Sequence, residues 1–142
     1  MSLEERFSAA LHTSARLWRA ALDRRMKDQG ISQASWLAVA YIAKASEPMS
    51  QSELAGLLGV EAATLVTTLD KLEKNGLVER TPSVRDRRVK HLGLTADGHA
   101  LYAKVREKAD TMRVELLREL DPAEMERATH LLEKLQSVIE RS

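Results

Sequence analysis

The sequence predicts a mainly α-helical fold with a small β-hairpin. Three observations support this prediction: amphipathic helical spacing at both ends of the chain, helix-capping signals around a glycine near its centre, and a basic loop between two short apolar runs. With 142 residues, 44% of them hydrophobic, the chain can bury one core and has little left for a second independent domain.

Composition excludes several classes of protein. The absence of cysteine rules out disulfides, Cys-ligated zinc and thiol-based sensing, and it fits a reducing compartment. No apolar run approaches the roughly 20 residues of a membrane span, and residues 1–29 lack the apolar block of a signal peptide. We therefore expect a cytoplasmic protein.

The first third of the chain predicts two helices. Residues 3–28 place apolar side chains at three- and four-residue spacings, and Gly30 is a suitable stop. Ser32 can cap a second helix over 33–46, which is apolar on most sides and therefore central. Pro48 ends it and leaves room for a very short strand before the next cap.

A helix-turn-helix pattern follows. Ser50 and Glu53 fit a capping box, so a helix is expected to start at Gln51. Gly59 supplies a left-handed turn, and the next helix covers residues 62–75.

This second helix has two faces at helical spacing. The predicted apolar face consists of Leu65, Val66, Leu69 and Leu72. The opposite, polar face consists of Thr64, Thr67, Thr68 and Lys71. We interpret the polar face as the candidate surface for reading DNA.

Two short runs, 77–80 and 89–92, predict strands joined by a loop over 82–88. Between positions 80 and 90 the chain carries five cations against one anion, Asp86, a net charge of +4 in a chain of net charge +1. The positive field is therefore concentrated on one hairpin, as expected for the wing of a winged helix-turn-helix that binds double-stranded DNA.

The C-terminal third predicts two more helices. A long helix can start at Thr95 or Asp97, although Gly98 weakens its first turn. Asp121 as cap and Pro122 at the first helical position then start a last helix with an apolar seam.

That seam is too short to be stable alone, so we expect the terminal helices to intertwine with those of a second subunit in a two-fold dimer. This arrangement divides the chain into an N-terminal dimerisation helix (1–32), a winged helix-turn-helix DNA-binding domain (33–95) and C-terminal dimerisation helices (96–142). The expected dimer contacts are Phe7, Leu11, Leu132, Leu135 and Ile139.

Three segments resemble the MarR family of bacterial regulators, and within it the SlyA-like branch. They are ISQASW, LAGLLGVEAATLVTTLDKLEKNGLVER and SVRDRRVKHLGLT. The resemblance covers nearly the whole chain and implies a homodimer that controls transcription by occupying a pseudo-palindromic operator. We expect it to act as a repressor and to need no cofactor. The residues it places at DNA are Ser50, Gln51, Ala62, Ala63, Thr64, Thr67, Thr68, Lys71, Arg85, Asp86, Arg87 and Arg88.

In family terms the helix over 62–75 enters the major groove and Arg88 the minor groove. Arg87 holds phosphate or assists Arg88, and Asp86 pairs with a neighbouring arginine to brace the wing. A narrow minor groove concentrates negative potential, which favours an inserted guanidinium. Thr67 departs from the SlyA-like pattern, in which an arginine is frequent at this position. We therefore expect recognition to depend more on DNA shape than on direct base contacts.

Four residues, His12, Trp18, Arg19 and Trp36, are candidates for a pocket that binds a small aromatic carboxylate or phenol, the effector type that the resemblance suggests. Core packing is the competing and favoured interpretation of the tryptophans. The four histidines lack the spacing of a metal site, and no nucleophile setting indicates an enzyme. The alternative function is a winged-helix assembly module that uses its basic tip for protein contact.

Overall fold

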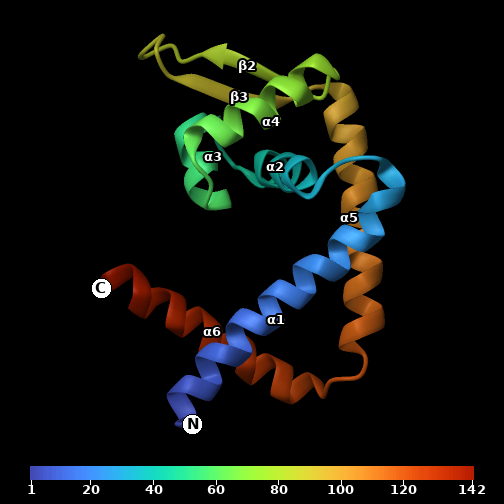
Figure 1. Ribbon diagram of the computed structural model, residues 1–142, viewed down its shortest axis with the longest axis vertical. Coiled ribbons are helices and arrows are strands. Elements are labelled where there is room, and N and C mark those ends of the chain that lie inside the picture. Colours follow the sequence, from blue (N-terminus) through green and yellow to red (C-terminus); the bar gives the residue numbers. More distant parts are fainter. The chain divides into compact units, whose positions relative to one another are not determined.

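The structure, a computed structural model, describes residues 1–28 and 30–142 in full and the backbone alone at Gln29. It confirms a mainly helical fold with a small antiparallel sheet (Figure 1). The elements in chain order are α1 (Leu3–Met26), η1 (Lys27–Gln29), α2 (Gln33–Lys44), β1 (Met49–Ser50), α3 (Gln51–Leu58), α4 (Ala62–Lys74), β2 (Val78–Pro82), β3 (Lys90–Leu94), α5 (Ala96–Leu117) and α6 (Pro122–Arg141). Residues 1–109 and 110–142 form two compact units.

The described strands form one antiparallel sheet in the order β1-β3-β2. Within the hairpin, Val78 pairs with Leu94 and Pro82 with Lys90. Both strands therefore reach two residues further toward the C-terminus than the sequence predicts. Pro82 is tolerated because β2 is an edge strand of the sheet, where a backbone N–H can face away from the neighbouring strand.

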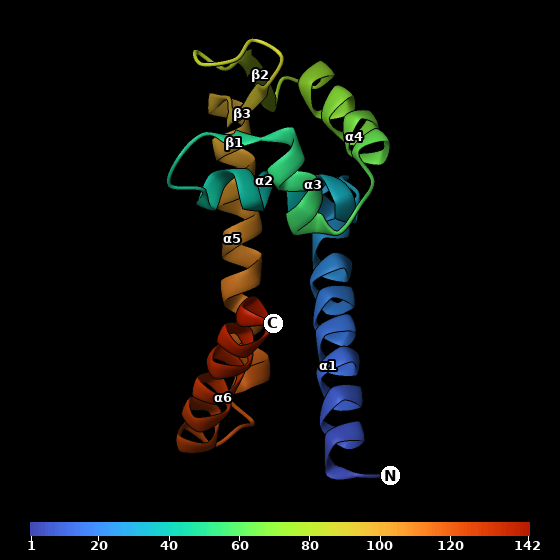
Figure 2. The ribbon, with the colours of Figure 1, turned by 90° about the vertical axis from the view of Figure 1, so that its left-hand side faces the viewer.

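The core of the first unit is built around α2. This helix contacts α3, α4 and β3, which confirms the prediction of a central helix. The buried cluster includes Ala38, Val39, Ile42, Leu54, Leu65, Leu69, Leu72, Val78 and Leu92. α1 extends away from this lobe, with the N-terminus at its far end (Figure 2).

A second buried cluster joins α1 and α2. Met26, Trp36 and Val105 form its centre, and the indole Nε1 of Trp36 donates a hydrogen bond of 3.1 Å to Oδ1 of Asp23. Because Trp36 is 3% exposed, its polar atom needs such a partner. The cluster therefore holds the C-terminal part of α1 against α2.

The predicted helix starts are found at the serine and aspartate caps. Ser32, Ser50 and Asp121 accept hydrogen bonds from backbone N–H groups three residues ahead, at 3.3, 3.1 and 3.2 Å. Gly59 has φ +68°, in the left-handed region that the turn between α3 and α4 requires. α2 is shorter than predicted and ends at Lys44.

The start of α5 is fixed by Thr95. Its hydroxyl donates a hydrogen bond of 2.6 Å to the carbonyl of Gly76 and accepts one of 3.0 Å from the N–H of Gly98. The expectation that Gly98 is a weak point is incomplete, because this glycine is buried against the Leu77 carbonyl. The end of α4, the start of β2 and the start of α5 are thus joined at one place.

In the second unit, α6 has no buried residue among those described. Leu132 and Ile139 on its apolar seam are 37% and 59% exposed. Among the described residues no single helix has the length and apolar composition of a membrane span. Only α3 and α4 taken together have that length and composition, and they are bent by 110° relative to each other.

Candidate nucleic-acid interface

α4 turns one side to the core and the other to solvent. Leu65, Leu69 and Leu72 are buried, as predicted. Val66 was predicted on the same face but is 38% exposed. The prediction was wrong because Val66 follows Leu65 by one residue, a rotation of about 100° around the helix.

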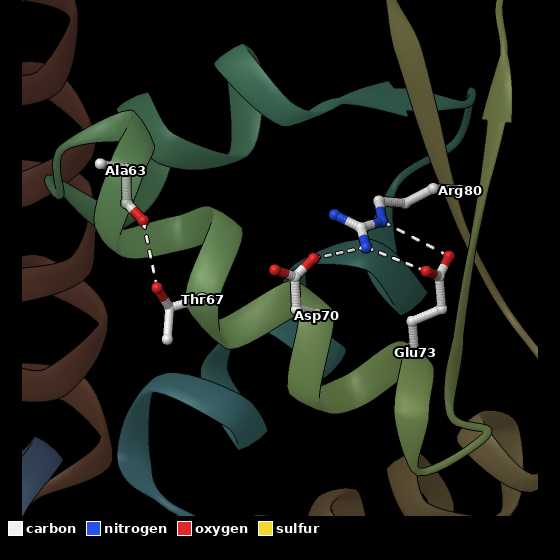
Figure 3. A network of polar contacts seen from close by, with 5 residues as sticks. All are labelled: Ala63, Thr67, Asp70, Glu73 and Arg80. Carbon is white, nitrogen blue, oxygen red and sulfur yellow. Dashed lines mark hydrogen bonds and ion pairs between the residues drawn. The ribbon is translucent and has the colours of Figure 1, made fainter.

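The exposed side of α4 carries threonines whose hydroxyl protons are already used. Thr67 donates to the carbonyl of Ala63 at 3.4 Å, and Thr68 to that of Thr64 at 3.5 Å (Figure 3 shows the first pair). These side chains therefore offer oxygen lone pairs and methyl groups, suited to a donor or a thymine methyl. Lys71 is exposed, and Thr68 is half-buried.

The first turns of α3 and α4 differ in what they can offer a phosphate. Ser50 uses its hydroxyl as a cap, and the side-chain oxygen of Gln51 is buried without a hydrogen-bond partner among the described residues. Ala62 and Ala63 are exposed, and Glu61 makes no described side-chain cap. The backbone N–H groups at the start of α4 are therefore available to an anion.

The loop between β2 and β3 is closed by backbone hydrogen bonds. Ser83 N–H donates to the Val89 carbonyl at 2.8 Å, and Val89 N–H to the Asp86 carbonyl at 3.0 Å. The hydroxyl of Ser83 accepts from the N–H of Arg85 at 3.3 Å, and Ser83 is buried. Ser83 was not predicted from the sequence, although a serine that bonds to a backbone N–H two residues ahead is a known local turn signal.

At the tip of the loop, Asp86 holds Arg88. The backbone N–H of Arg88 donates to Oδ1 of Asp86 at 3.0 Å, and Nε and Nη2 donate to the two carboxylate oxygens at 3.2 Å each. These hydrogen bonds lower the pKa of Asp86, and those from the Arg88 side chain have a larger effect than the one from its backbone N–H. The Arg88 side chain is nevertheless 91% exposed, and Arg85 and Arg87 are exposed beside it.

Arg80 does not belong with these exposed cations, although the charge count of the hairpin included it. Its Nη2 lies 2.6 Å from Oδ1 of Asp70 and 2.9 Å from Oε1 of Glu73, and its Nε donates to Oε2 of Glu73 at 3.4 Å (Figure 3). The hydrogen bonds to Glu73 and, to a lesser extent, to Asp70 raise the pKa of Arg80. The hydrogen bonds from Arg80 to Glu73 in turn lower the pKa of Glu73. The positive field of the tip therefore depends on Arg85, Arg87, Arg88 and Lys90.

A small pocket of about 180 Å³ lies between α1, α2 and the start of α4. Arg19 and Gln33 lie at its edge together with Thr64 and Thr68 of α4. Its apolar lining consists of Ala34, Leu37, Leu58, Val60 and Leu65.

Of the four residues predicted for a ligand pocket, Arg19 is the one that lines this hollow. Trp36 lies in the core, His12 is exposed and Trp18 is half-buried. Among the described residues no group of three or more His, Cys, Asp or Glu side chains is arranged to hold a metal ion.

Comparison with known proteins gives a consistent result. The model of the MarR family matches residues 31–90. The crystal structure of the transcriptional regulator PA3341 is 37% identical, covers 96% of this chain and 99% of its own, and superposes with a TM-score of 0.87.

Two Staphylococcus aureus proteins support the fold at lower identity. MarR in complex with salicylate and kanamycin is 22% identical, with a TM-score of 0.84 over 99% of this chain and 94% of that one. MepR in its DNA-binding conformation is also 22% identical, with a TM-score of 0.79 over 94% and 98%.

Proposed function

This chain belongs to the MarR family of transcriptional regulators, and on that premise we propose that it binds a pseudo-palindromic operator in double-stranded DNA as a homodimer and represses transcription by occupying it. The observation that carries the proposal is the combination, on one lobe, of an exposed threonine face on α4 and exposed arginines at the hairpin tip. No enzymatic step is part of it.

The proposed docking places α4 in the major groove. Thr64, Thr67 and Lys71 then face base edges or phosphates, and the free N–H groups at Ala62 and Ala63 meet the backbone. The wing places Arg87 and Arg88 at the adjacent minor groove, where Asp86 limits the positions that Arg88 can adopt. MepR, solved in a DNA-binding conformation, shares this fold.

The dimer is supported by exposed apolar residues on the terminal helices. Phe7 and Leu11 on α1 are 37% and 36% exposed, and Leu132 and Ile139 on α6 are exposed as well. Amphipathic helices of this kind gain stability when a second subunit covers them. Two copies of α4 can then meet half-sites about 34 Å apart.

The pocket beside Arg19 is the proposed effector site. Arg19 can pair with a carboxylate, the apolar lining suits one aromatic ring, and Thr64 and Thr68 couple the site to α4. S. aureus MarR, a relative of the same fold, was solved with salicylate. A small aromatic carboxylate that binds here would favour an α4 position that no longer fits both half-sites.

The effector proposal is tested with benzoate, salicylate and related phenolic acids in thermal-shift and operator-release assays. We expect at least one of them to raise the melting temperature and to release the operator, and Arg19→Gln to abolish both effects. Release that survives Arg19→Gln would place the effector elsewhere.

The DNA-binding proposal is tested by selecting genomic fragments with the purified protein and then titrating the operator against salt. A dimer that neutralises roughly 6 to 10 phosphates should lose about 10³ to 10⁵ in affinity between 50 and 200 mM salt. Arg87→Ala/Arg88→Ala should weaken binding and flatten this dependence. If the wild-type chain binds no duplex at 50 mM salt, the assembly-module alternative is favoured instead.

A further inference from the structure

Arg80 connects the wing to the recognition helix. It comes from β2, yet its guanidinium lies against two carboxylates of α4, those of Asp70 and Glu73 (Figure 3). Three of its hydrogen bonds go to these groups, at 2.6, 2.9 and 3.4 Å. We call Arg80, Asp70 and Glu73 the Arg80 clasp.

The low exposure of its side chain distinguishes Arg80 from the other hairpin arginines. The Arg80 side chain is 18% exposed, whereas that of Arg88 is 91% exposed. A guanidinium that already has two carboxylate partners has little to gain from a phosphate. Arg80 is therefore poorly placed to contribute to the phosphate contacts that determine the salt dependence of DNA binding.

The clasp also lies next to the reading surface. Asp70 follows Thr67 by three residues and so occupies the next turn on the same side of α4. Asp70 and Glu73 are 58% and 44% exposed, so without a partner both would present negative charge on a helix that approaches phosphates. Arg80 compensates part of that charge and holds both side chains toward β2.

We propose that Arg80 is a positioning residue for operator recognition: through Asp70 and Glu73 it fixes α4 relative to the wing, so that groove reading and wing contact occur in register. The proposal rests on the DNA-binding function proposed above. The clasp itself makes no phosphate contact, and its contribution is to the geometry of the two elements that do.

The test is a double variant that removes the clasp without changing net charge, Glu73→Gln/Arg80→Gln. We expect operator affinity to fall about tenfold at every salt concentration while the slope of log affinity against log salt stays that of the wild type. Arg87→Gln is the contrast, because loss of a phosphate contact should reduce that slope by about one per arginine. Hydrogen exchange should also show faster opening of β2 and of the C-terminal half of α4.

Two further variants keep the test interpretable. Lys44→Gln/Glu47→Gln removes one exposed cation and one exposed anion outside the predicted dimer and DNA contacts, also at constant net charge, and should leave operator affinity unchanged. Arg80→Lys keeps the charge but lacks the forked donor, so its operator affinity should fall by less than tenfold. This variant provides the test if the double variant is too unstable to assay.

The outcomes separate the two proposals. Wild-type protein without duplex binding at 50 mM salt would end the DNA-binding proposal. Operator binding by the wild type together with unchanged affinity in Arg80→Lys and the double variant would overturn the positioning role alone. A reduced salt slope in the double variant would also overturn it, because Arg80 would then be a phosphate contact.

Discussion

A methyl group on Gly98 would lie 2.1 Å from the carbonyl oxygen of Leu77. That oxygen is held in place, because it accepts a hydrogen bond of 3.1 Å from the N–H of Thr95. The neighbouring atom is backbone rather than the end of a flexible side chain, so it cannot turn aside. Gly98 therefore lies in the first turn of α5 because α5 and the start of β2 approach each other closely there.

Gly98→Ala should destabilise the protein by about 1–3 kcal/mol, although alanine is the better helix former, because overpacking outweighs propensity at this site. Gly56→Ala is the matched control: Gly56 lies within α3 with open space around it, and its replacement should stabilise by about 0.5–1 kcal/mol. Urea unfolding followed by circular dichroism measures both. Equal shifts in the same direction would show that the Leu77 contact has no effect on stability.

Thr95→Val should lower the free energy of unfolding by about 1–2 kcal/mol, because it removes the cap of α5 and the bond to the Gly76 carbonyl while keeping the shape of the side chain. Thr95→Ser retains the hydroxyl and should lose much less. Thermal melts of the two variants under one buffer provide the comparison, and indistinguishable melts would contradict the capping role.

Local signals were read correctly from the sequence. The caps at Ser32, Ser50 and Asp121 and the left-handed Gly59 depend on neighbours within a few residues, and each is found in the structure. The same holds for Leu65, Leu69 and Leu72 on the core side of α4, because helical periodicity places them on one face, whereas Val66 was assigned to that face wrongly.

Two contacts that depend on how separate elements pack, those of Arg80 and Gly98, were not predicted. Arg80 lies seven residues from Glu73 and ten from Asp70, across the end of a helix and a turn, so their meeting depends on the angle between α4 and β2. The sequence shows Arg80 as one more cation of a basic loop. The Gly98 contact was missed for the same reason, since propensity describes a helix in isolation.

The pKa of Asp86 should respond to Arg88. The lowered pKa means that the charged carboxylate is favoured in the folded wing, so the stabilisation is present above the unfolded-state pKa and is lost as pH falls through the folded-state value. Carboxyl-carbon NMR titration should show a midpoint below the ordinary aspartate value. Arg88→Gln should raise that midpoint, though not fully, because the backbone N–H at position 88 still donates. Superimposable titration curves would refute the pairing in solution.

Trp36→Phe should destabilise the first unit by about 1–3 kcal/mol, because the buried cluster loses volume and Asp23 loses the indole donor. Trp18→Phe is the control: Trp18 is half-buried and should cost less. Urea unfolding gives the two free energies, and tryptophan emission of Trp18→Phe, in which Trp36 is the remaining tryptophan, should be blue-shifted until the protein unfolds. Emission at the wavelength of exposed indole in the native state would show that Trp36 is not the packing residue that joins α1 to α2.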